Sequence, residues 1–160
     1  MRQIILLFIS LGLFAPTALI AQNENVQLAV WANEAIIATY TYDYQNFITE
    51  QKTIAKYFTG EGWTNYSTAF SASKIPDQVQ KNTYFVSAVA QLPIQIKTID
   101  SNHWEASAPV LVVYQNPQYM QKQTLQVTIQ FTTASQGQGV RGLAISNLQS
   151  VVTETPCQCK

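Results

Sequence analysis

The hydrophobic pattern of this chain changes its period close to Asn82. Before that residue, apolar side chains recur three and four positions apart, which is the spacing of one helix face. After it, apolar and polar residues alternate, which is the spacing of a strand with one buried side. The chain is therefore expected to fold as a set of helices followed by a set of strands.

The first part of the chain predicts four helical stretches. They are expected over about 27–42, 43–58 and 61–72, with a short piece from Pro76 to Asn82. Thr59 or Gly60 is the expected cap of the third helix. The end of the first helix stays open, because Tyr40-Thr41-Tyr42 favours a strand locally.

The second part predicts four strands, at about 94–97, 104–114, 125–131 and from Leu143 onward. Turn-forming residues separate them, and these connections are too short for helical crossovers, so the strands should be antiparallel. The predicted fold is a two-layer α+β domain. In it, the N-terminal helices pack on one face of a curved, mainly antiparallel four-stranded sheet.

The N-terminus has the parts of a secretory signal peptide. Arg2 precedes the apolar run 4–14, Pro16 interrupts it, and small residues end at Ala21. We expect residues 1–21 to be cleaved after Ala21, leaving one exported domain over 22–150 in the periplasm. The alternative is an uncleaved segment that anchors a periplasmic domain in the inner membrane.

Charge is sparse along this chain. Only 11% of the residues are charged. Cleavage of the signal peptide would remove Arg2 and leave 8 of the 9 basic residues against 9 acidic ones, a net charge near −1. Without a basic cluster to release counterions from phosphates, nucleic acid is not an expected partner. Gly137-Gln138-Gly139 lacks the lysine and helix start of a phosphate-binding loop, and no cofactor is expected.

The two cysteines, Cys157 and Cys159, lie in a predicted C-terminal tail, residues 151–160. They are a candidate disulfide. Pairing with another chain, binding of a soft metal, and a tail whose thiols have no structural role remain open alternatives. A metal site is not expected, because four ligands are usual and the chain has one histidine.

The sequence offers no catalytic constellation. His103, the single histidine, stands at a predicted turn-to-strand junction. Asp43, between Tyr42 and Tyr44, is better explained as a helix cap or a hydrogen-bond partner of a buried tyrosine than as a general base. With the other carboxylates scattered, we expect the protein not to be an enzyme.

Aromatic residues are dense between Trp31 and Trp63. At helical spacing they indicate packing first, although some can face a concavity or a partner. Trp63 is expected to be a core anchor, so Trp63→Ala should lower stability sharply. The core or interaction candidates are Trp31, Tyr40, Tyr42, Tyr44, Tyr57, Phe58 and Trp63.

Several of these residues also carry a family resemblance. The motifs are Trp31-Ala32 with Ala35, Tyr40-Thr41-Tyr42-Asp43-Tyr44, Tyr57-Phe58-Thr59-x-x-Gly62-Trp63, Ala69-x-x-x-Ser73, Trp104, Pro109-Val110-Leu111-x-x-Tyr114 and Leu125-x-Val127-Thr128. Across about residues 31–148 the chain resembles the DotI/IcmL (TraM-type) family of type IVB secretion and conjugation systems. The resemblance implies a cystatin-like (nuclear-transport-factor-2-like) fold.

Two functions are compatible with these observations. The first is a non-enzymatic exported component or accessory of a type IVB secretion system that contacts other secretion-system or envelope proteins, or a second copy of itself. The alternative is a periplasmic module that binds a small ligand in a cavity between sheet and helices. Contact with the membrane is expected only if the N-terminal segment is retained.

Overall fold

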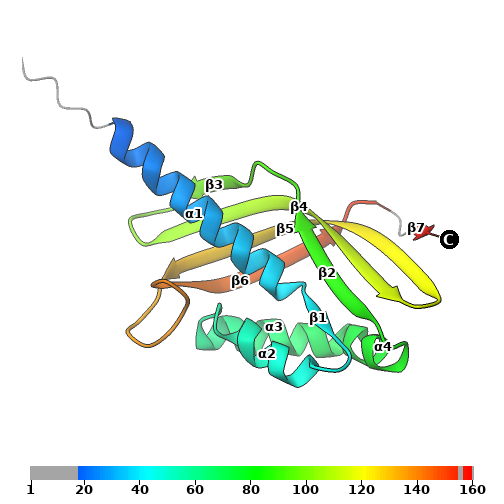
Figure 1. The fold of residues 1–160 in the computed structure, drawn as a ribbon. Helices are drawn as coiled ribbons and strands as arrows, with labels where there is room; N and C mark the ends of the chain where they lie inside the picture. Colours follow the sequence, from blue (N-terminus) through cyan, green and yellow to red (C-terminus); the bar gives the residue numbers. More distant parts are fainter. Residues whose placement is uncertain (1–17, 155–156, 160) are drawn as a thin grey trace, which may run out of the picture.

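The computed structural model describes residues 18–154 and 157–159. Within them, the helices are α1 (Ala18–Thr39), α2 (Phe47–Ala55), α3 (Gly60–Ala72) and α4 (Ile75–Lys81). The strands are β1 (Tyr42–Asp43), β2 (Phe85–Ala90), β3 (Gln95–Thr98), β4 (His103–Asn116), β5 (Tyr119–Thr133), β6 (Leu143–Val152) and β7 (Cys157–Cys159). Helices precede the main strands, which confirms the predicted α+β class (Figure 1).

The strands of the described residues form a single antiparallel sheet in the order β1-β2-β4-β5-β6. β3 also pairs with β4, and β7 pairs with β5. The longest pairing joins β4 to β5, from His103 opposite Thr132 to Asn116 opposite Tyr119. The antiparallel arrangement was predicted correctly, whereas the prediction of four strands was too low, because this sheet has seven.

The predicted helix over 43–58 is too long. Asp43 accepts hydrogen bonds from the backbone N–H groups of Gln45 and Asn46, each at 2.7 Å. These bonds form a turn, and Tyr42 and Asp43 pair with β2 as strand β1 before α2 begins. The predicted helix over 61–72 is confirmed as α3, and Thr59 Oγ1 caps it by accepting a hydrogen bond from Gly62 N at 3.0 Å.

The first helix begins earlier than predicted and ends at Thr39 instead of Tyr42. Residues 1–17 of the predicted signal peptide lie outside the described residues, and 18–21 form the start of α1. Among the described helices, none combines the length and apolar character needed to cross a bilayer. Cleavage after Ala21 stays a prediction.

The core lies between α1 and the sheet. In the view of Figure 1, α1 crosses the face of the sheet, and α2, α3 and α4 gather below it. Trp31 of α1 is only 2% exposed, and its ring centroid lies 4.9 Å from that of Phe131 in β5. Phe131 in turn stacks on Trp104 of β4. Alternate residues of β4 and β5 complete the buried face: Ala106, Ala108, Val110, Val112, Leu125, Val127 and Ile129.

Candidate functional site

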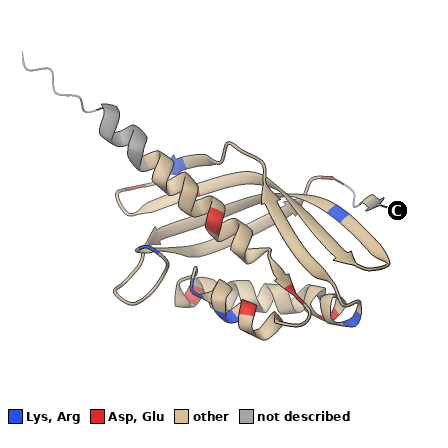
Figure 2. Ribbon diagram, in the orientation of Figure 1, with Lys and Arg blue, Asp and Glu red and all other residues tan. Residues whose placement is uncertain are grey.

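A groove of about 500 Å³ opens between α3 and β6. Residues of α3 and β6 line it together with Tyr40 just after α1, Tyr42 of β1, Ile75 of α4 and residues of β4 and β5. Its lining residues are Tyr40, Tyr42, Gly62, Asn65, Tyr66, Ala69, Phe70, Ser73, Ile75, Tyr114, Gln123, Leu125, Asn147, Leu148, Ser150 and Val152. None of these residues is charged, and Figure 2 shows how sparse charge is on the rest of the described chain.

Gly62 brings α3 into contact with β6 at one end of this groove. A Cβ atom at Gly62 would lie 2.5 Å from the backbone oxygen of Ile145 and 3.0 Å from that of Ser146. Just before α3, Thr59 N donates to Ile145 O at 2.9 Å, and Ile145 N donates to Tyr57 O at 2.7 Å. The beginning of β6 is therefore covered, and the groove follows the rest of the strand to Val152.

Four tyrosines line the groove: Tyr40, Tyr42, Tyr66 and Tyr114. Burial raises the pKa of Tyr40 to about 12, against a smaller opposite effect of its hydrogen bond with Ser150. Burial also raises the pKa of the other three hydroxyls. All four are therefore neutral at physiological pH, and they can donate or accept hydrogen bonds without introducing charge.

Two of the predicted aromatic candidates, Tyr40 and Tyr42, belong to this groove. The other five do not line it: Trp31, Tyr44, Tyr57, Phe58 and Trp63. Trp31 and Phe58 are buried in the core, and the remaining three are partly buried against it.

Trp63 lies at the margin of the core. Its ring centroid is 5.8 Å from that of Phe58 and 5.6 Å from that of Tyr66, and its side chain is partly buried. Because it keeps some contact with solvent, we expect Trp63→Ala to destabilise the protein less than truncation of a fully buried tryptophan.

The groove also contains residues that the sequence did not single out as site residues, notably Tyr66, Tyr114, Asn147 and Ser150. Tyr66 shares a helical spacing with Trp63 and Phe70, a pattern that indicates packing. In the sequence, the groove is indicated only by hydroxyl and amide side chains on otherwise apolar faces. These side chains identify a site only once α3 and β6 are known to lie side by side.

The residues considered for catalysis lie outside the groove. His103 Nδ1 is 2.9 Å from Asp100 Oδ1, and both side chains are more than half exposed. The backbone N–H of Asn102 and then the His103 side chain lower the pKa of Asp100. Asp43 serves the turn before α2. In the described part of the chain, no three His, Cys, Asp or Glu side chains gather as metal ligands would.

The end of the chain pairs with the sheet where the sequence predicted a tail. Val151 and Val152 finish β6, and β7 places Cys159 opposite Met120 and Cys157 opposite Lys122 of β5. β7 can pair there because β5 is longer than β6 and extends beyond the end of their pairing, which leaves residues 120–122 of β5 available. The candidate disulfide between Cys157 and Cys159 stays a prediction.

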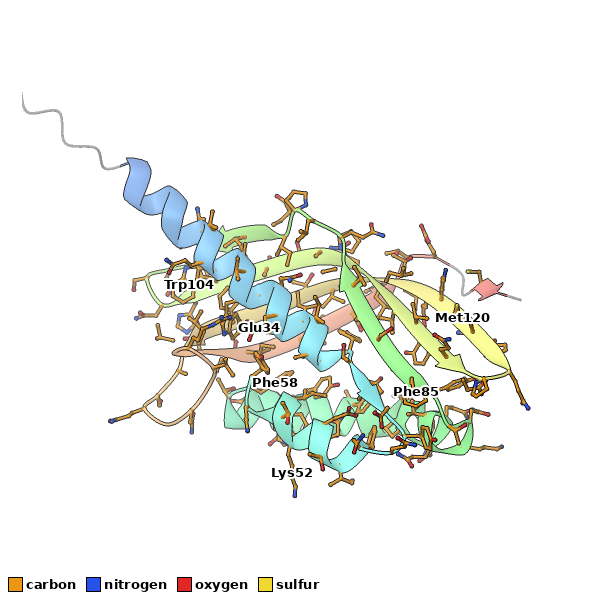
Figure 3. All side chains as sticks on the ribbon, in the orientation of Figure 1. Glu34, Lys52, Phe58, Phe85, Trp104 and Met120 are labelled. Atoms are coloured by element: carbon orange, nitrogen blue, oxygen red, sulfur yellow. The ribbon has the colours of Figure 1, made fainter. Side chains whose placement is uncertain are left out.

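Glu34 connects α1 to two distant segments. Tyr57 Oη donates to Glu34 Oε1 at 2.8 Å, and Arg141, in the loop between β5 and β6, donates to Glu34 Oε2 at 2.5 Å. Figure 3 labels Glu34 midway along α1 and Phe58 below it. The hydrogen bond from Tyr57, followed by the bond and charge of Arg141, lowers the pKa of Glu34, although burial acts in the opposite direction.

This lowered pKa predicts a loss of stability in acid. A carboxyl group whose pKa is lower in the folded state stabilises that state above its unfolded pKa, here about 4.5, and the contribution disappears as pH falls through the folded pKa. Glu34→Gln should therefore be less stable than wild type at pH 7, and the difference should shrink below pH about 4.5. Urea unfolding across this range measures it. A constant difference would contradict the assignment, and Tyr57→Phe should reproduce part of the effect.

Comparison with known proteins gives a family and a set of solved structures. The family model of the type-IV b secretion system inner-membrane complex component (DotI/IcmL) matches residues 20–152. An IcmL-like type IV secretion system protein from Legionella pneumophila subsp. pneumophila str. Philadelphia 1 is 60% identical, with 84% of this chain and 96% of that chain covered and a TM-score of 0.80. No curated protein matches this chain.

Two further structures share the fold. The periplasmic domain of DotI is 30% identical, with 79% of this chain and 94% of that chain covered and a TM-score of 0.73. A periplasmic fragment of TraM is 16% identical, with 82% of this chain and 98% of that chain covered and a TM-score of 0.66. At this identity the comparison shows likeness of fold alone. The predicted nuclear-transport-factor-2-like architecture is thus the one that these periplasmic domains adopt.

Proposed function

This chain belongs to the DotI/IcmL family of type IVB secretion-system proteins, and from that membership we propose that it is a non-enzymatic component or accessory of such a system. It acts through contacts with other secretion-system or envelope proteins. The observation that carries this proposal is the 60% identity to an IcmL-like protein over 96% of that protein's length. Identity of that extent includes surfaces as well as the core.

The proposed place of action is the periplasm, after export by the signal peptide 1–21. The likeness to a periplasmic domain of DotI supports it. Cell fractionation and N-terminal sequencing test it, and we expect a periplasmic form that begins at Gln22. Retention of Arg2 in a carbonate-resistant membrane fraction would favour the inner-membrane anchor instead.

Affinity purification tests the proposed partners. We expect the tagged full chain to capture type IVB components from solubilised envelopes at both about 0.05 M and about 0.5 M salt. Salt screens attractions between charges, and this chain has few charges that could contribute to binding. A second, differently tagged copy in the same cells tests for a homo-oligomer. Reproducible turnover that His103→Ala or Asp43→Asn abolishes, with no component captured at either salt, would overturn the proposal.

The uncharged groove favours a second candidate, a module that binds a small neutral ligand. Its volume and its mixture of apolar walls and hydroxyl groups are typical of ligand sites. A screen of neutral metabolites by thermal shift tests this function. The double variant Tyr66→Phe, Tyr114→Phe should lose the ligand-induced shift, and an unchanged shift in this variant would reject the groove as the ligand site.

A further inference from the structure

In the part of the chain that the structure describes, the outer edge of β6 is occupied only at its beginning. There, the segment 57–59 runs parallel to β6, and Phe58 forms an isolated bridge with Ile145. The two hydrogen bonds between this segment and Ile145 hold the bridge, and the Phe58 side chain is buried against the core. After Thr59 the chain turns into α3. Among the described residues, no backbone segment pairs with this edge beyond Ser146.

The register of β6 identifies which groups face this open edge. Thr153 N donates to Thr124 O of β5 at 3.0 Å. The direction of hydrogen bonding alternates along an antiparallel strand. The N–H and C=O groups of Val151 and Gln149, two and four residues before Thr153, therefore also face β5. The backbone groups of Leu148, Ser150 and Val152 therefore face the opposite way. The side chains of the same three residues line the groove.

This edge also lacks three features that usually prevent strand addition, namely charged side chains, proline and a bulge. Residues 148–152 contain no charge and no proline, and the irregularity in the pairing of β5 with β6 lies before them, at Gln130 and Phe131. Ser150 and Val152 are exposed, Val152 by 51%. Exposed strand edges without such protection readily accept another strand.

We propose that the open edge of β6 binds an extended, uncharged segment of another envelope protein, which adds to the sheet as a strand and places alternate side chains in the groove. This inference rests on the proposed function and specifies how a partner is held. Main-chain hydrogen bonds supply affinity in this mode of recognition, and the groove selects side chains. The protein's own segment 57–59 occupies the same edge in the same manner.

The chemistry of the groove determines the kind of segment. With no charged lining residue, a buried Lys, Arg, Asp or Glu of the segment would have no ionic partner, which is costly. Apolar and hydroxyl side chains instead match the apolar walls and the four tyrosines. α3 borders the groove along β6, so a single extended segment fits more readily than the sheet edge of a second copy, which is flanked by its own α3.

The probe for this site is a phage-displayed library of random dodecapeptides, selected on the full protein. We expect uncharged peptides with alternating apolar and polar residues. Ser150→Pro removes the N–H that faces the open edge without removing a bond to β5, since proline is tolerated at such edge positions. It should weaken peptide binding about tenfold or more, whereas the control Ser150→Ala, which keeps the N–H and loses only the hydroxyl, should bind close to normally.

Amide hydrogen exchange gives a second readout. Bound peptide should slow exchange at Leu148, Ser150 and Val152 and leave Gln149 and Val151, which already face β5, nearly unchanged. If Ser150→Pro does not fold, Val152→Lys replaces it as the test, because it places a charge at the exposed end of the groove. Its folded form should lose the peptides, and unchanged binding would overturn the proposal.

Other outcomes also reject the inference. A library that yields no binders would reject it, and so would peptides that bind folded Ser150→Pro as tightly as wild type. Concentration-dependent dimerisation that Ser150→Pro abolishes would assign the edge to a second copy instead. A folded Ser150→Pro that loses peptides yet captures the same type IVB components would refute this edge as the partner site and leave the proposed function standing. Failure of the wild type to capture any component would instead count against the proposed function.

Discussion

Replacing Trp31 with alanine should lower the free energy of unfolding by about 3–5 kcal/mol, a large fraction of the stability of a domain this size. The side chain is 2% exposed and packs on Phe131 and Tyr57. Its Nε1–H donates to Val140 O at 2.8 Å, so truncation creates a cavity and also removes one of the two donors to that carbonyl, the other being Leu143 N at 3.2 Å. Urea unfolding followed by circular dichroism measures the loss.

Two variants control this experiment. Trp31→Phe keeps much of the ring packing and removes the hydrogen bond, so it should cost less than Trp31→Ala. Trp63→Ala removes the same atoms from the margin of the core and should also cost less. If Trp63→Ala proved the more damaging of the two alanine variants, the centre of the core would have been assigned incorrectly.

Replacing Gly62 with valine should force α3 away from β6. The nearest atoms to a Cβ at this position include the backbone oxygens of Ile145 and Ser146, which cannot rotate aside as a side chain would. Overpacking of this kind costs about 1–3 kcal/mol or more. We expect a lower urea midpoint and faster amide exchange at Thr59 and Ile145, whose hydrogen bonds hold the two elements together.

Gly60→Val is the matched control. A Cβ atom at Gly60 meets nothing within 4 Å, and the residue is the first of the same helix. Its effect should stay within about 0.5 kcal/mol, as is usual at exposed sites. Equal destabilisation by the two variants would show that helix propensity, and not the approach of α3 to β6, explains the glycine at position 62.

Much of the fold could be predicted from local patterns. The alternation in residues 125–131 gave strand β5, and Thr59 before an apolar helical stripe gave α3 with its cap. Strand β2 was not predicted, because its buried positions, Ala88 and Ala90 among them, include small side chains that weaken the alternation. The start of α2 was misplaced because Asp43 forms a turn inside a segment whose apolar residues still had helical spacing.

The groove could be predicted only in part. Tyr40 and Tyr42 were among the aromatic candidates, but Tyr66 and Tyr114 each occur in a pattern that is equally typical of core packing. Their convergence depends on how far α3 stands from β6, and Gly62 sets that separation through backbone atoms of a strand much later in the chain. No spacing within a single element encodes it.

The contacts that hold α1 against the loop between β5 and β6 have a consequence for folding. Trp31 and Val140 are 109 residues apart, and Glu34 and Arg141 are 107 apart. Contacts of such separation make a domain slow to fold, because the long intervening chain must be closed before they form. Of the described elements, α1 is therefore synthesised first but cannot complete its docking until β5 and the following loop exist. For the export proposed above, this order would delay the closing of these contacts until the loop between β5 and β6 has crossed the membrane.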